Sequence, residues 1–343
     1  MATIKDVARL AGVGLGTASR VVSGKGPVAA ATAARVRKAI AQLEFRPSHA
    51  ARSLLSGSSQ MIGVYIPVLK GTFYTPILQL IQLELRASGQ HMVVAFGTGD
   101  GDERRQAVEG IRFLLERGCD GLVVISNALK DDDIAELGPR QERLVVLNHY
   151  YKGIREQCFS ADHRQGGRLA AQALLELGHR RFAVIGGPPT SPDNVARISG
   201  FMGELAKHGI GASRVFVVAS DFSPEGGWAA AGALLASGHK CTALFCANDE
   251  MAVGALSRFQ EEGVDVPGQL SVMGYDDTHT AEFSAPRLTS VHVPWSDVTL
   301  NGLHWLLNRC YGAERPVARR FPVRVTWRAS VAKAPPARKT ASR

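Results

Sequence analysis

Short apolar runs alternate with longer amphipathic segments from residue 61 to about residue 275. The runs contain few polar side chains, which is typical of strands buried on both faces of a parallel sheet. They lie at residues 61–67, 91–96, 121–125, 143–148, 182–187, 215–220, 242–247 and 270–275. This pattern predicts an α/β fold, because strands in an all-β protein would not be separated by helical segments.

The segments between these runs have helical periodicity. They lie at residues 75–88, 104–117, 165–178, 193–209, 224–236 and 249–262. The alternation breaks near residues 158–164, so we expect two open sheets rather than one. The chain of 343 residues is also too long for one ordinary core, and two or three domains are expected.

The composition is that of a globular protein, with 45% hydrophobic and 21% charged residues. No apolar run approaches the roughly 18 residues of a membrane span, and the first six residues contain no apolar signal region. The five cysteines are scattered and form no CxxC pair, so we expect neither a disulfide framework nor a metal site. A reduced, cytoplasmic location without a membrane partner fits these features.

The net charge of +9 is concentrated at the N-terminus. Residues 1–60 contain nine basic and two acidic residues, and residues 331–343 contain four basic residues and no acidic one. A basic head on a nearly neutral body is the electrostatic pattern of a nucleic-acid contact. We interpret residues 331–343 as a disordered basic tail rather than a binding arm.

The basic head has the periodicity of three short helices. Thr3 is a candidate N-cap paired with Asp6, and Gly12 is a candidate end of the first helix. The second helix is predicted over residues 15–23 and the third over about residues 30–43. A small helical bundle with a solvated basic face is the simpler alternative. A helix-turn-helix would instead place the start of the second helix in the major groove of DNA.

The residues of this head favour the second interpretation. The segment TIKDVARLAGVGLGTASRVVSGKGPV resembles the DNA-binding head of the LacI/GalR family of transcriptional regulators. The segment LEFRPSHAARSLLSGSSQMIGVYIP resembles the hinge helix and first core strand of that family. The resemblance extends to about residue 328 and is greatest to galactose-repressor-type members.

The resemblance implies a helix-turn-helix domain at residues 1–47, followed by a hinge helix and linker at residues 48–60. It also implies a periplasmic-binding-protein-like core of two subdomains, with parallel sheets flanked by helices. The N-subdomain would comprise about residues 61–160 and 292–320, and the C-subdomain about residues 161–291 and 321–330. Segment 292–320 would therefore return to the first subdomain.

Family positions that contact DNA can be carried over by residue. Leu15 and Gly16 occupy the main base-reading positions, and Leu54 occupies the position of a leucine inserted into the minor groove. The remaining candidates contact bases or phosphates and are Thr3, Thr17, Ser19, Arg20, Ser48 and Arg52. Three departures occur at Gly14, Ser23 and Ala29, and each lost cap would cost about 0.5–2 kcal/mol of local stability.

Polar and aromatic residues follow the predicted strands, where ligands of open α/β sheets bind. An aromatic ring beside charged and amide groups is the mixture that suits a sugar. The segments ARISGF, CANDEMAVGAL and GYDDT resemble the effector-binding segments of the family. Together these observations give the candidates Phe73, Asn148, His163, Gln165, Arg197, Phe222, Asn248 and Asp276. Taken singly, Asp162, Asn248 and Asp249 could instead be helix caps or form hydrogen bonds within loops, and Asp277 is expected to be structural.

The resemblance implies a repressor that binds a pseudo-palindromic operator as a homodimer and responds to a small sugar-like effector. No cofactor is expected. An exported sugar-binding protein could share the core, but it would have an export signal and no basic head. An enzyme is also disfavoured, because the sequence contains no Walker loop, HExxH or GxSxG motif and therefore offers no catalytic residues.

Overall fold

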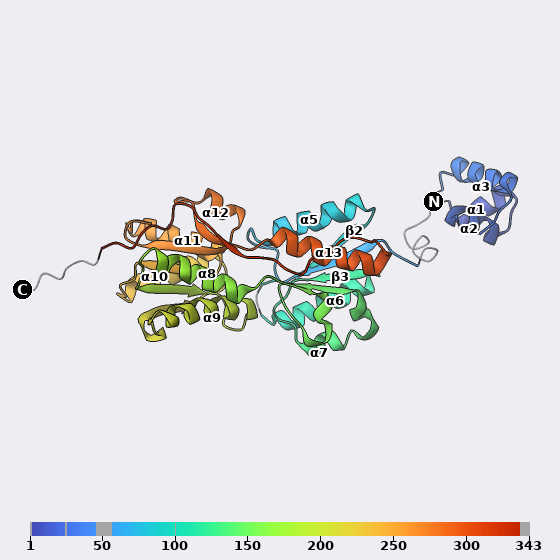
Figure 1. Ribbon diagram of the computed structural model, residues 1–343. Coiled ribbons are helices and arrows are strands. Elements are labelled where there is room, and N and C mark those ends of the chain that lie inside the picture. Colours follow the sequence, from blue (N-terminus) through green and yellow to red (C-terminus); the bar gives the residue numbers. More distant parts are fainter. Residues whose placement is uncertain (1, 25, 46–56, 100, 337–343) are drawn as a thin grey trace, which may run out of the picture.

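The structure is a computed structural model that describes residues 2–24, 26–45, 57–99 and 101–336. A small three-helix head lies at one end, and two α/β lobes follow it in a row (Figure 1). Among the described residues, no helix is long and apolar enough to cross a membrane.

The head comprises α1 (Ile4–Ala11), α2 (Leu15–Ser23) and α3 (Ala30–Gln42), which confirms the predicted helix-turn-helix. Thr3 and Asp6 form the predicted capping box, and Gly12 ends α1 with a positive φ of 60°. No side-chain cap bonds to the start of α2 or α3, as the glycine at position 14 and the alanine at position 29 predict. The core of this unit is small and consists of Val7, Ala8, Ala11, Ala18, Val36 and Ala39.

The first lobe, here called the N-lobe, is built on a parallel sheet with the strand order β2-β1-β3-β4-β5. Its strands are β1 (Met61–Ile66), β2 (His91–Phe96), β3 (Gly121–Val124), β4 (Leu144–Leu147) and β5 (Cys158–Phe159). Helices α5 (Tyr74–Ala87) and α13 (Trp295–Tyr311) pack on one face, and α6 (Glu103–Glu116) and α7 (Asp131–Ala135) pack on the other. Two 3-10 helices, Gly138–Arg143 and Lys152–Gln157, flank β4.

The second lobe, here called the C-lobe, has the strand order β11-β10-β9-β8-β6-β7. Its strands are β6 (Phe182–Gly186), β7 (Val215–Ala219), β8 (Ala243–Cys246), β9 (Ser271–Asp276), β10 (Thr289–His292) and β11 (Arg324–Thr326). A 3-10 turn at Ala212–Arg214 precedes β7. Its helices are α8 (His163–Glu176), α9 (Pro192–Lys207), α10 (Pro224–Ala236), α11 (Asp249–Glu261) and α12 (His279–Phe283). The two lobes confirm the predicted α/β class with two mainly parallel sheets.

The chain passes between the lobes three times. It leaves the N-lobe after β5, returns after β10 to form α13, and leaves again before β11. Helix α13 packs on β3, β4 and β5, close to α5 (Figure 1). A Cβ on Gly302 would lie 2.6 Å from the side chain of Leu147, so this helix rests directly on the sheet.

Three strands lie outside the predicted apolar runs. They are β5, which has two residues, β10, and β11, which is a short antiparallel edge strand beside β10.

The start of the predicted tail also differs from expectation. The backbone N–H of Ala334 donates to Leu177, and the carbonyl of Ala332 accepts a hydrogen bond from the buried His179, so these residues are fixed to the C-lobe. Residues 337–343 lie outside the described residues.

Paired glycines bring neighbouring helices of the C-lobe into close contact. A Cβ on Gly167 of α8 would lie 1.9 Å from the carbonyl oxygen of Arg197, and one on Gly200 of α9 would lie 2.0 Å from that of Arg164. Gly227 of α10 and Gly254 of α11 form a second such pair. Only glycine allows this backbone-to-backbone approach. The first pair fixes the position of α9 against α8, and α9 carries residues of the candidate site.

Candidate DNA-contact surface and effector site

The first turns of α2 present a continuous group of side chains on the surface of the head. Leu15 is 47% exposed, and Gly16 and Arg20 are also exposed. Thr17 and Ser19 are half-buried, and Ala18 between them is fully buried against the core of the head. The five predicted contact residues of α2 therefore lie around the start of the helix that a helix-turn-helix offers to DNA.

The other predicted DNA contacts are placed differently. The Thr3 hydroxyl caps α1 by accepting from the backbone N–H of Asp6 at 3.4 Å, and it also donates to the Asp6 carboxylate at 2.7 Å, although Thr3 remains exposed. Ser48, Arg52 and Leu54 lie outside the described residues. The surface of the head is otherwise basic, with Lys5, Arg9, Arg35, Arg37 and Lys38 all exposed.

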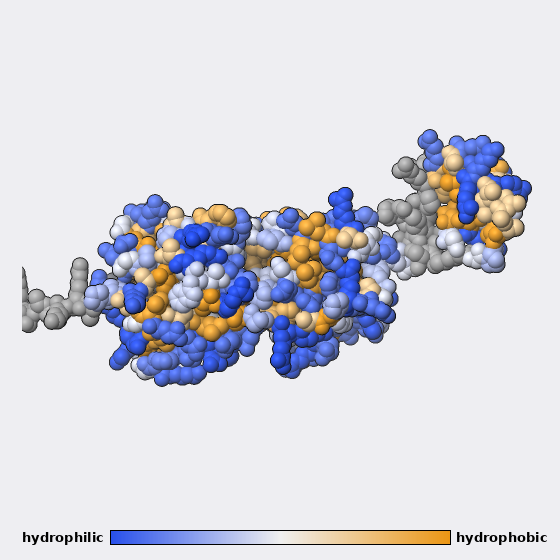
Figure 2. Space-filling model, turned by 45° about the horizontal axis from the view of Figure 1, so that its top comes forward, coloured by the Kyte–Doolittle hydropathy of each residue, from blue (hydrophilic) through white to orange (hydrophobic). Residues whose placement is uncertain are grey.

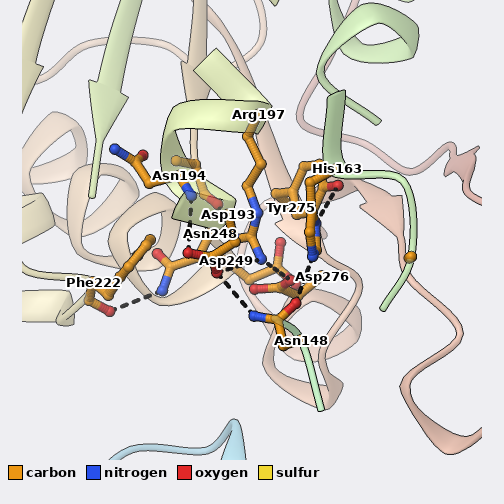
Figure 3. Close-up of polar contacts among 12 residues, drawn as sticks. Asn148, His163, Asp193, Asn194, Arg197, Phe222, Asn248, Asp249, Tyr275 and Asp276 are labelled. Carbon is orange, nitrogen blue, oxygen red and sulfur yellow. Dashed lines mark hydrogen bonds and ion pairs between the residues drawn. The ribbon is translucent and has the colours of Figure 1, made fainter. Parts of the chain in front are cut away.

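Arg197 is the centre of a buried polar cluster between the two lobes (Figure 3). It lies on α9 and is 2% exposed. One guanidinium nitrogen donates to the carbonyl of Ala247 at 2.6 Å. The other lies 3.2 Å from Asp276 and 3.4 Å from Asp193. The guanidinium also stacks on the ring of Tyr275, 4.1 Å from its centroid.

The two carboxylates differ in their surroundings. Burial raises the pKa of Asp276 to about 6, against the opposing effect of Arg197. Burial also opposes ionisation of Asp193, but Arg197 and hydrogen bonds from Ser191 and Asn148 outweigh it and hold its pKa below the usual range. Near neutral pH this cluster therefore contains one cation and two largely ionised acids, which gives it a net negative charge.

Asn148 connects the lobes through this cluster. It follows β4 in the N-lobe, and its amide nitrogen donates to Asp193 of the C-lobe at 3.0 Å. Its amide oxygen lies 2.5 Å from Nε2 of His163, whose Nδ1 lies 3.0 Å from the Tyr275 hydroxyl. Burial and the neighbouring Arg197 hold the pKa of His163 well below its usual range, so the imidazole is neutral. Asn127 adds a second bridge from the N-lobe to Asp193 at 2.9 Å.

Aromatic rings border the cluster on the N-lobe side. Phe73, which precedes α5, contacts Trp295 edge to face with centroids 5.0 Å apart. Trp295 begins α13 and lies 6.0 Å from the His163 ring. These flat apolar surfaces beside charged groups provide the two kinds of contact that a sugar ring uses.

Three buried polar atoms at the cluster have no hydrogen-bond partner among the described residues. They are Nε of Arg197, Oδ1 of Asp276, which forms the ion pair with Arg197 described above, and Nε1 of Trp295, which lies beside the Asp276 carboxylate. Leaving a buried donor or acceptor unpaired costs about 1–3 kcal/mol, so such atoms are rare in a purely structural network. Nε of Arg197 has neither a hydrogen bond nor an ion pair among the described residues, so it is the clearest donor for a ligand hydroxyl group.

Residues with unusual backbone angles also gather at this site. Asn148, Phe222 and Asp276 have positive φ values of 69°, 67° and 99°. Each follows or ends a strand, and each is a predicted site residue. Backbone strain of this kind is concentrated at functional sites, because surrounding contacts must enforce it.

Other predicted effector residues have mainly structural contacts. Asn248 caps α11 by accepting from the N–H of Met251 at 2.9 Å, and its amide nitrogen donates to the Phe222 carbonyl at 2.9 Å. The Phe222 ring packs on Gly187, to one side of Arg197. Gln165 is half-buried in the first turn of α8 and makes none of the polar contacts of the cluster. Asp162 caps α8, as its alternative interpretation predicts.

Sequence reasoning missed Asp193, Tyr275 and Trp295. Asp193 precedes Arg197 by four residues, which places the two side chains on one face of a helix, so this spacing could have indicated the pair. Tyr275 lies within an apolar strand, and Trp295 lies in a segment without a predicted element. Asp249 is also buried in this region, but it accepts hydrogen bonds from Thr278 and Ser290, and burial raises its pKa to about 8.

The chain matches two family models. Residues 3–48 match the model described as bacterial regulatory proteins, lacI family, and residues 171–331 match a periplasmic binding protein-like domain. It is 32% identical over 294 residues to the HTH-type transcriptional regulator GalR of Escherichia coli, covering 86% of this chain and 85% of GalR. The chain belongs to the LacI family.

Solved structures of LacI-family proteins have the same fold. A LacI-family regulator from Burkholderia phymatum is 51% identical, with a TM-score of 0.77, over 80% of this chain and 99% of that one. The lac repressor dimer bound to operator and an anti-inducer is 27% identical, with a TM-score of 0.81, over 96% and 99%. The regulator CelR in complex with cellobiose is 29% identical, with a TM-score of 0.67, over 96% and 100%. This LacI-family chain is thus a helix-turn-helix transcriptional regulator with a ligand-binding core.

Proposed function

We propose that this regulator binds a pseudo-palindromic operator as a homodimer in the cytoplasm and that a small sugar between its lobes controls operator affinity. The observation that carries the sugar proposal is the buried cluster of Arg197, Asp193 and Asp276, with the Arg197 Nε left without a hydrogen bond and with aromatic rings beside it. The occurrence of operator-bound and cellobiose-bound LacI-family structures supports the same combination of ligands.

The position of the cluster suggests how a ligand would act. Asn148 and Asn127 reach it from the N-lobe, whereas Arg197 and Asp276 belong to the C-lobe. A ligand that bonds to both sets would stabilise one relative position of the lobes. If the two heads of a dimer fit the operator better or worse in that position of the lobes, the ligand changes the fraction of molecules that can bind DNA. Coupling on the order of 1–3 kcal/mol is sufficient for useful control.

A second copy of the chain is the proposed protein partner. Large apolar side chains are exposed on both lobes, including Leu83 of α5, Phe96 at the end of β2 and Phe283 of α12. Apolar surface is visible on both lobes in Figure 2. The lac repressor of known structure is a dimer, and a two-fold partner would bring a second head to the second half of the operator.

A thermal-shift screen tests the sugar proposal. The full chain is heated with monosaccharides, disaccharides and sugar acids, since a ligand that binds only the folded state raises the melting temperature. We expect uncharged sugars to raise it and sugar acids or sugar phosphates to have little effect, because the site has a negative charge excess and its one cation is already paired with two acids. A larger shift with a sugar phosphate than with its parent sugar would contradict this expectation.

Operator binding should depend steeply on salt. Lys5, Arg9, Arg20 and other exposed bases surround the contact surface, and each phosphate they neutralise releases counterions. For 6–10 phosphate contacts, affinity should fall by roughly 10³–10⁵ between about 50 and 200 mM salt. Fluorescence anisotropy on an operator duplex selected by the protein measures this. Binding of an uncharged sugar over the same range is the control and should change little, and a flat DNA response would exclude the head as the main contact.

A further inference from the structure

Asp120 holds the segment that connects the core to the DNA-binding head. It lies between α6 and β3, and its carboxylate accepts hydrogen bonds from the backbone N–H groups of Ser59 and Gln60, both at 2.8 Å. It also accepts from the hydroxyl of Ser58 at 2.5 Å. These residues directly precede β1 and belong to the described end, residues 57–60, of the predicted hinge and linker. The point where the chain leaves the core towards the head is therefore held by this carboxylate, together with hydrogen bonds that Gln60 accepts from His91 and Gln90.

The same carboxylate is bound to the end of α13. The hydroxyl of Tyr311, the last residue of this helix, donates to Asp120 at 2.9 Å. The thiol of Cys310 donates to the Asp120 carbonyl at 3.4 Å. Burial opposes ionisation of Asp120, but the hydrogen bonds from the linker and from Tyr311 hold the pKa of its carboxyl group below the usual range, so the anchor is a charged acceptor. Charge-assisted hydrogen bonds of this kind are roughly twice as strong as neutral ones.

The other end of α13 lies at the effector site. Trp295 is its first residue, contacts Phe73 and His163, and has its indole N–H beside the Asp276 carboxylate of the effector site. The helix has 17 residues, which corresponds to about 25 Å. Its buried leucines and Gly302 pack it tightly against the N-lobe sheet, so a displacement at one end moves the other.

We propose that α13 transmits the state of the effector site to the DNA-binding head, and that Tyr311 and Asp120 position the linker at its far end. This inference rests on the proposed function and specifies the path by which the effector site is coupled to the DNA-binding head. Closure around a ligand would change the environment of Trp295, and α13 would pass the shift through Tyr311 to the carboxylate that holds Ser58, Ser59 and Gln60. A hydrogen-bonded contact between one rigid helix and the linker needs no rearrangement of the sheet.

A double-mutant cycle on operator affinity tests this route without requiring a known sugar. The variants are Trp295→Phe, Tyr311→Phe and the pair, all in the full chain, measured on an operator duplex selected by the wild-type protein. Trp295→Phe keeps an aromatic ring, and Tyr311→Phe removes a single hydroxyl. The two sites are about 25 Å apart, and effects of such distant changes on affinity normally multiply within about twofold.

We expect the double variant to depart from the product of the single effects by about threefold or more, within the range found for residues along a coupling route. The matched control combines Trp295→Phe with Tyr150→Phe. The Tyr150 hydroxyl also donates a single hydrogen bond, to the Ser160 carbonyl, but Tyr150 lies in the segment after β4 and contacts neither Tyr311 nor Asp120 through that bond. That pair should multiply within about twofold. Thermal melting of each variant confirms folding.

The proposal is overturned if the effects of Trp295→Phe and Tyr311→Phe multiply within about twofold, including the case in which neither changes operator affinity. It is also overturned if the Tyr150 pair departs equally, because the effect would then be global. These results leave operator and sugar binding by the wild-type protein untouched. In contrast, a wild-type protein that selects no sequence from a random DNA pool would refute the proposed function and this route with it.

Discussion

Replacing Arg197 with methionine should destabilise the protein by about 3–5 kcal/mol near pH 7.5 and abolish sugar binding. The variant leaves Asp193 and Asp276 buried without their cation, and removing one partner of a buried ion pair exposes the full cost of burying the other. Urea unfolding of the full chain measures the loss of stability. Arg168→Met is the matched control, because Arg168 is 42% exposed and its buried partner Glu204 keeps Gln172 and Lys207, so its loss should cost about 0–1 kcal/mol.

The destabilisation caused by Arg197→Met should shrink at low pH. Burial already raises the pKa of Asp276 to about 6, and loss of Arg197 removes the largest effect that lowers it. A carboxyl group whose pKa is higher in the folded than in the unfolded state binds more protons when folded, so its effect on stability becomes less favourable as pH rises. The variant should therefore approach wild-type stability as pH falls from about 7.5 towards about 5. A pH-independent difference would show that the loss comes from packing instead of charge.

Gly200→Ala should cost at least about 1–3 kcal/mol and also weaken sugar binding. The added Cβ would lie 2.0 Å from the carbonyl oxygen of Arg164, and a backbone atom cannot move aside as a flexible side chain can. Helix α9 must then shift away from α8, and it carries Asp193 and Arg197 with it. Calorimetric unfolding and sugar binding by the variant measure the two effects.

The same helix offers the control. Gly203 is one turn further along α9 and is exposed, and a Cβ there would meet no atom within 4 Å. Gly203→Ala should be neutral or stabilise by about 0.5–1 kcal/mol, because alanine has the higher helix propensity. Equal losses at positions 200 and 203 would contradict the role assigned to the close contact between α8 and α9.

The main elements of the fold follow from local pattern. Each of the eight predicted apolar runs contains a strand, and the six predicted helices are present. Strands β5, β10 and β11 could not be predicted this way, because they are short and owe their structure to pairing with neighbours rather than to their own residues. The hydrogen bonds of Ala332 and Ala334 likewise depend on partners far away in the chain.

The candidate site was predictable where residue type and strand ends coincide. Asn148, His163, Arg197 and Asp276 are named from the sequence, and the structure brings them together. Asn248 illustrates the limit of such reasoning, since the residue that suits a sugar also suits a helix cap, and its hydrogen bonds are those of a cap. Trp295 could not be predicted, because it reaches the cluster only through the return of the chain to the N-lobe.

That return also governs the order in which the protein can be completed on the ribosome. The head ends before residue 46 and the C-lobe sheet has five of its strands by residue 292, whereas the N-lobe, begun at residue 61, lacks α13 until residue 311 is made. About 150 residues separate β5 from the end of α13, which at 5–20 residues per second is a wait of roughly 10–30 s. During synthesis the N-lobe sheet thus has one apolar face open, and a nascent chain stalled in this interval would expose β3 and β4 to chaperones or to other chains.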